Sequence, residues 1–189
     1  MKRKEFIKRS ALSFTVAQLP LFGESNDDNT SSDPSEKTSP WMDAEDLSDY
    51  QALVTQLLSK PDGYKVEGNW TLGKVLSHCA QSIEYSLSGY PEMKSSIFRG
   101  SIGKIAFSVF AFKNKMNHGL EEPIPGAEEI PNNTDVKLGA KRLLQAIDRF
   151  SKTAESSLRP HFAYGELTKE EYDLAHTLHI KNHMERLLL

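Results

Sequence analysis

The sequence predicts an all-α protein: a four-helix bundle with one additional short helix and a long crossover connection. Five segments repeat apolar residues at spacings of three and four, and none of comparable length alternates as a strand would. Most of these segments have roughly 17 to 22 residues, or about 25–33 Å as helices, which suits side-by-side packing. They cover residues 43–59, 71–88, 96–116, 136–154 and 168–183.

The first two segments each carry one apolar stripe. Residues 43–59 place large apolar side chains on one side, and a turn containing Pro61 and Gly63 ends the helix. Residues 71–88 carry a longer stripe, which the Gly-Tyr-Pro sequence at 89–91 stops. We expect both helices to bury these stripes in a shared core.

A long connection separates the third and fourth segments. Residues 96–116 repeat apolar side chains from Phe98 to Met116, and residues 136–154 have the most regular, heptad-like pattern. The connection, residues 117–134, contains three prolines. Its length lets the chain cross over instead of simply turning back.

The last segment has a well-marked beginning. Thr168 and Glu171 have the spacing of a capping box, in which each side chain accepts a hydrogen bond from the other residue's backbone amide. A second connection, residues 158–165, leads into this helix.

Three histidines share one face of the last helix. At about 100° per residue, His176, His179 and His183 fall within an arc of roughly 60° that also carries apolar side chains. Imidazoles that point toward an interior need polar partners. One partner is a metal ion, because the His-x3-His pair of His179 and His183 suits a shared first-row metal. The other is internal hydrogen bonding of ordinary core histidines.

A pair of imidazoles leaves a third ligand to be found, and His78, His118 and His161 are the remaining histidines. His78 lies on the flank of an apolar stripe, where it can reach a cleft between helices. His118 stands at the predicted end of the third helix, where a histidine complements the helix dipole. His161 follows Pro160 in a loop, either in a pocket or exposed to solvent.

Composition and charge exclude several classes of function. A net charge of −3, without a basic stripe after the first ten residues, argues against nucleic-acid binding. The single cysteine, Cys79, excludes an intramolecular disulfide and a cysteine-cluster metal site, and we interpret it as a buried core residue. No apolar run approaches the roughly 20 residues of a transmembrane helix.

The N-terminal part of the chain differs from the rest. Residues 1–22 are basic and then apolar, as in a signal segment, and residues 3–8 (RKEFIK) resemble the twin-arginine export motif with Lys4 in place of the second arginine. Export to the periplasm through this degenerate signal and retention in the cytoplasm both stay open. Residues 23–40 lack large apolar side chains and predict a disordered linker before a folded domain at 41–189.

Four segments carry the motifs of a known family: VLSHCAQSIEY (75–85), EPIPGA (122–127), PHFAYG (160–165) and AHTLHIKNH (175–183). Together they resemble an uncharacterised branch of the DinB/YfiT-like metalloenzyme superfamily, domain-of-unknown-function family 1569. The resemblance extends over residues 41–187. It implies a DinB-like four-helix bundle that holds a divalent metal on one histidine of the second helix and a His-x3-His of the last. These positions are His78, His179 and His183.

His176 has no place in that pattern, and we expect it to support a ligand or to line a pocket. Our candidate pocket residues are therefore His176, His161, Tyr164, Gln81 and Glu84. His161 and Tyr164 arrive on the loop just before the histidine-bearing helix.

Three neutral imidazoles on a divalent ion leave at least one coordination position open, as in catalytic sites. The ion would be Zn, Ni, Mn or Fe, and it would activate water or a low-molecular-weight thiol. We therefore predict a metal-dependent hydrolase or thiol transferase with a small-molecule substrate, and homodimerisation stays open. Two alternatives stay open: a bundle that binds a small ligand or partner without catalysis, and a structural protein whose histidines are satisfied internally.

Overall fold

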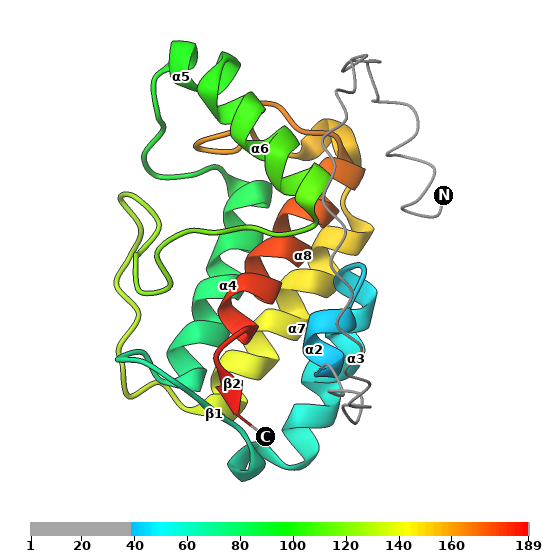
Figure 1. The fold of residues 1–189 in the computed structure, drawn as a ribbon, viewed down its shortest axis with the longest axis vertical. Coiled ribbons are helices and arrows are strands. Elements are labelled where there is room, and N and C mark those ends of the chain that lie inside the picture. The colour runs from blue at the N-terminus through cyan, green and yellow to red at the C-terminus, as the bar shows by residue number, and fades with distance from the viewer. Residues whose placement is uncertain (1–38, 189) are drawn as a thin grey trace, which may run out of the picture. The chain divides into compact units, whose positions relative to one another are not determined.

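Figure 1 presents the computed structural model of the protein, which describes residues 39–188. This part of the chain is mostly helical and contains one short antiparallel sheet, which confirms the all-α class. The predicted signal-like segment at residues 1–22, and the predicted linker at 23–40 apart from its last two residues, lie outside the described residues.

The helices follow one another along the chain with short 3₁₀ turns between some of them. The α-helices are α2 (Pro40–Asp43), α3 (Leu47–Ser59), α4 (Leu72–Ser88), α5 (Ser96–Gly100), α6 (Ile102–Lys113), α7 (Val136–Lys152) and α8 (Lys169–Met184). The 3₁₀ turns are η1 (Pro61–Gly63) and η2 (Glu155–Ser157), and the strands are β1 (Lys65–Val66) and β2 (Leu187–Leu188). None of the helices in residues 39–188 combines the length and apolar character that crossing a bilayer requires.

Helices α3, α4, α7 and α8 run roughly along the long axis of the molecule and pack around one core (Figure 1). The contact between α4 and α7 is the most extensive. Each of the four helices contributes fully buried side chains to the core, among them Tyr50, Leu57, Leu76, Ile83, Leu143, Ile147, Tyr172 and Ile180.

Three of the predicted helices form within a few residues of their predicted bounds, because their ends are specified locally. Thr71, Asp135 and Thr168 cap α4, α7 and α8 by accepting hydrogen bonds from backbone amides of the first turn. The capping box between Thr168 and Glu171 is confirmed, with both hydrogen bonds present.

The first helix starts later than predicted. Residues 43–59 were expected to be continuous, but α2 ends at Asp43 and α3 begins at Leu47. Asp46 interrupts the helix by acting as an N-cap, since its carboxylate accepts from the amides of Ser48 and Asp49.

The third helix also departs from the prediction for residues 96–116. Ser101 has non-helical dihedral angles (φ −127°, ψ −90°) and separates α5 from α6. Helix α6 ends at Lys113, and Asn114 follows it in the left-handed conformation. The predicted apolar stripe is largely exposed, with Ile102 61% and Phe112 81% accessible. Periodicity identifies an apolar face, but tertiary packing decides whether another element covers it. Within α6 only Gly103 and Phe107 are buried, and Met116 is buried in the connection that follows.

Two glycines allow the backbones of α4 and α7 to approach closely. A Cβ atom at Gly139 would lie 2.4 Å from the carbonyl oxygen of Gly73, and one at Gly73 would lie 2.0 Å from the carbonyl oxygen of Thr134. No side chain fits at these distances, so this contact requires glycine on both helices.

We predict that Gly139→Ala destabilises the protein. At exposed positions within helices, by contrast, replacing glycine by alanine stabilises a protein by up to about 1 kcal/mol. Forcing the two helices apart should lower the free energy of unfolding by about 1–3 kcal/mol, measured as a shift of the urea midpoint. Gly100→Ala is the control, because a Cβ atom there meets nothing within 4 Å. An unchanged midpoint for Gly139→Ala would contradict the close approach of the helices.

Candidate metal centre

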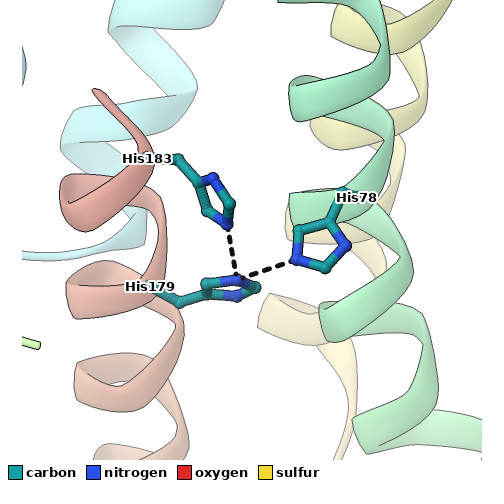
Figure 2. Close-up of side chains that lie close together, drawn as sticks. All are labelled: His78, His179 and His183. Carbon is teal, nitrogen blue, oxygen red and sulfur yellow. Dashed lines mark hydrogen bonds between the residues drawn. The ribbon is translucent and has the colours of Figure 1, made fainter. Parts of the chain in front are cut away.

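Two helices that are distant in sequence bring three imidazoles together in the structure (Figure 2). His78 projects from α4, and His179 and His183 project from successive turns of α8. The Nε2 atom of His179 lies 3.2 Å from that of His78 and 3.1 Å from that of His183. These three residues are 2%, 9% and 2% exposed, respectively.

The three imidazoles cannot satisfy one another by hydrogen bonding alone. A neutral imidazole nitrogen either carries a hydrogen and donates or carries one in-plane lone pair and accepts. His179 Nε2 can therefore form a hydrogen bond with the Nε2 atom of either His78 or His183, but not with both. Burial opposes the protonation of an imidazole that would supply a further hydrogen. One cation shared by three lone pairs would satisfy all three nitrogens, so these histidines could hold a metal ion.

The spacing of the nitrogens also fits a common ion. Zinc–nitrogen bonds of about 2.0–2.1 Å, at angles between square and tetrahedral, separate two ligand nitrogens by about 2.9–3.4 Å. The observed separations of 3.1 and 3.2 Å lie within this range.

Burial keeps all three rings in the neutral form that binds metals. It lowers the pKa of His78 to about 3 and that of His183 to about 2, with smaller contributions from neighbouring imidazoles. The pKa of His179 is likewise lowered well below 6.5, mainly by burial. At neutral pH no proton has to leave before an ion enters.

An aromatic side chain fixes the orientation of two of these rings. Trp70 stacks on His183 with an interplanar angle of 8° and meets His78 edge-on, at a centroid distance of 5.1 Å. The ammonium of Lys74 lies 4.7 Å from the centre of the Trp70 ring. Trp70 therefore occupies one side of the cluster, and Lys74 lies on the indole.

A cavity of about 240 Å³ adjoins the cluster, and five of the six histidines line it: His78, His118, His161, His176 and His179. This volume is below the range of about 300–1,000 Å³ for pockets that hold drug-sized ligands, so the cavity suits a smaller molecule. A larger surface groove along α3, about 620 Å³, is lined by residues without a titratable side chain. Of these two sites, the smaller cavity is therefore the one lined by titratable side chains.

Residues 39–188 match the family described as protein of unknown function (DUF1569). The chain belongs to this family. The match covers nearly all of the described part of the chain and agrees with the family named from the four sequence motifs. No curated protein and no solved structure matches the chain. The family description states no reaction. The residues of the site are therefore the basis for inferring the chemistry of this DUF1569 domain.

The remaining pocket candidates divide into two groups. His161, Tyr164 and His176 line the cavity of the DUF1569 domain, and Gln81 and Glu84 do not. The amide of Gln81 donates to the carbonyl oxygen of Glu128.

Glu84 is engaged elsewhere, on the interface between α4 and α7. Its two carboxylate oxygens accept from Nε and Nη2 of Arg142, at 3.0 and 2.7 Å. This bidentate ion pair links the two helices and turns the carboxylate away from the histidine cluster.

The interpretation of His118 as a helix-terminal residue is wrong. Helix α6 ends at Lys113, and the following connection carries the His118 ring to 4.9 Å from that of His179 and 5.2 Å from that of His183, between ring centres. Its Nδ1 lies 2.9 Å from the carbonyl oxygen of Gly119, so Nδ1 carries the hydrogen. Nε2 is left as a buried acceptor without a hydrogen-bond partner among residues 39–188.

Sequence reasoning therefore missed His118 and Trp70 as neighbours of the cluster. Both residues come from irregular segments, where no periodicity reports which way a side chain faces. Cys79, by contrast, is a core residue as predicted: it is 1% exposed, and burial raises the pKa of its thiol.

Proposed function

We propose that this DUF1569 domain is a DinB-like metalloenzyme that holds one divalent ion on His78, His179 and His183. The observation that carries the proposal is that His179 Nε2 lies 3.2 Å from His78 Nε2 and 3.1 Å from His183 Nε2, an arrangement that three neutral imidazoles cannot satisfy by hydrogen bonding alone. The ion is Zn, Ni, Mn or Fe, because an imidazole site accepts several first-row metals.

Two features support the DinB-like assignment. Helices α3, α4, α7 and α8 pack together as a four-helix bundle with a long connection between α6 and α7. The histidines come from α4 and from two successive turns of α8, in the pattern that the sequence resemblance implies.

A bound divalent ion would lower the pKa of a water or thiol at its open position toward neutrality. The chain contributes the arrangement around that position. The three neutral imidazoles hold the ion without cancelling its charge, and Trp70 covers one side of the cluster. His118 offers a fixed lone pair at Nε2, which accepts the hydrogen of a water or other protic group beside the cluster.

The cavity next to the cluster favours catalysis over a purely structural ion. A structural zinc site is closed by four protein ligands, whereas in the described residues three donor residues meet beside an open space. We therefore propose a hydrolase if water is the nucleophile, or a thiol transferase if a low-molecular-weight thiol takes its place. The alternative is a bundle that binds a small ligand without turnover.

Metal-dependent turnover tests the proposal. Protein loaded separately with Zn, Ni, Mn or Fe is assayed with a nitrophenyl ester, and with a chloronitrobenzene electrophile in the presence of cysteine. We expect one of these reactions to require the ion and to fall at least about a hundredfold in His183→Ala. His118→Phe should keep the metal and lose about tenfold or more in turnover.

The two nucleophiles separate the candidate reactions. Ester hydrolysis without added thiol supports the hydrolase, and strict dependence on cysteine supports the transferase. Metal-loaded protein that turns over neither substrate, yet binds small ligands equally well after metal removal, would favour the non-catalytic binding module.

A further inference from the structure

Besides His78, His118 and His179, two further histidines, His161 and His176, line the cavity, and we call this pair its second polar end. His161 lies on the connection between η2 and α8, and His176 lies on α8 one turn before His179. Both rings are buried, at 7% and 2% exposure. Neither belongs to the set of three histidines that could hold an ion.

The loop around His161 fixes which ring nitrogen faces a ligand. Nδ1 accepts hydrogen bonds from the backbone amides of Ala163 and Tyr164, at 3.1 and 3.2 Å. Because Nδ1 is an acceptor and burial disfavours a charged ring, the hydrogen of this imidazole is on Nε2. Backbone hydrogen bonds to Gly165 and stacking on Tyr164, with 4.2 Å between ring centres, hold the ring in place.

His176 is held equally firmly and has an unused nitrogen. Its ring stacks on Tyr172, with centroids 5.3 Å apart, and meets Phe150 edge-on. Its Nε2 is buried, and no group in the described part of the chain forms a hydrogen bond with it. A buried polar atom in this condition costs free energy of folding unless something else satisfies it.

Neighbouring phenols do not fill this role. The hydroxyl of Tyr172 donates to the carbonyl oxygen of Arg159, and that of Tyr90 donates to the carbonyl oxygen of Ser82. The hydroxyls of these two tyrosines are thus engaged with backbone carbonyls, and Lys94 and Glu122, two exposed residues that also line the cavity, contribute charges of opposite sign.

We propose that this end of the cavity binds a carboxylate or carbonyl oxygen of the substrate, through His161 Nε2–H and His176. The substrate class is then a small molecule with its reactive group at the three-histidine cluster and an oxygen acceptor at its other end. A volume of about 240 Å³ limits it to a short chain or a single ring. This inference rests on the proposed function, because it places the reactive end at a bound ion.

Paired probes test the inference by binding. Hydroxamates chelate divalent metals, so the half-hydroxamates of malonic, succinic and glutaric acid each carry a metal-binding group and a distal carboxylate. Each is compared with the hydroxamate in which a methyl group replaces the carboxylate, by calorimetry on zinc-loaded protein. For the chain length that spans the cavity, we expect the carboxylate to bind about tenfold or more tightly, as a hydrogen bond to a charged group would give.

Two substitutions of His161 separate its donor from its structural role. In His161→Asn the side-chain oxygen can still accept from the loop amides, but the shorter side chain places no donor at the position of Nε2, so the preference for the carboxylate should disappear. In His161→Gln the amide nitrogen can stand near the position of Nε2, and part of the preference should return. Both variants should bind zinc and the methyl-ended probes as the unchanged protein does, because His161 is not a proposed ligand.

The outcomes distinguish the two proposals. Equal affinities for the paired probes at every chain length, or a preference that His161→Asn keeps, would overturn the carboxylate subsite while leaving the metal site supported. Failure of every hydroxamate to bind the zinc-treated protein would overturn the metal site and the inference together.

Discussion

His179→Ala is expected to abolish tight metal binding by this domain. His179 is the central member of the cluster, because its Nε2 contacts the Nε2 atoms of both His78 and His183. Removing it leaves two imidazoles from different helices, which cannot fix the ion. Loss of a residue that only supports a ligand costs about 10–100-fold in metal affinity, so loss of this ligand should exceed a hundredfold.

Metal content and thermal unfolding together measure this effect. In the unchanged protein, metal at about one hundred times its Kd should add about 2.7 kcal/mol to the free energy of unfolding. The variant should lose this stabilisation and copurify without metal, and circular dichroism should report an intact helical fold.

His176→Phe is the matched control for that change. It removes another buried imidazole from the same helix, packed on Tyr172 and Phe150, without removing a member of the three-histidine cluster. It should keep one equivalent of metal. If His179→Ala retained the metal affinity of the unchanged protein, the three-histidine site would be refuted.

The metal-free protein should lose stability steeply as the pH falls below 6.5. Burial lowers the pKa of His78 and His176 to about 3 and that of His183 to about 2. The unfolded chain, with its histidines near 6.5, therefore binds more protons than the folded chain below that pH. The stabilisation is fully present above pH 6.5 and is lost progressively as the pH falls toward 3.

The expected loss of stability is large because the pKa values of several histidines are lowered in the folded protein. Each contributes roughly 2 kcal/mol between pH 7 and pH 5, and the free energy of unfolding of a typical domain is about 5–15 kcal/mol. Urea unfolding of metal-free protein at pH 7 and pH 5 measures the difference. His176→Phe should reduce this difference in unfolding free energy by the contribution of one histidine. Equal stability of the unchanged protein at both pH values would contradict the burial of neutral rings.

The sequence determined those features that depend on neighbours along the chain. The hydroxyl of Thr168 reaches the amide of Glu171 within one turn, so the start of α8 was predictable. The same helical geometry put His179 and His183 on one face, because four residues make about one turn. The resemblance added His78, which the helical pattern alone left as one of three histidines.

Only the tertiary structure decided what depends on contacts between distant segments. The apolar stripe around Ile102 and Phe112 is exposed because no other described helix covers it, which periodicity does not report. His118 reaches the cluster because an irregular connection folds back over α8, and irregular backbone has no repeat from which direction can be calculated. The cavity and its second polar end arise in the same way, since His161 comes from a loop and His176 from α8, and both line one cavity only when the loop packs against the helix.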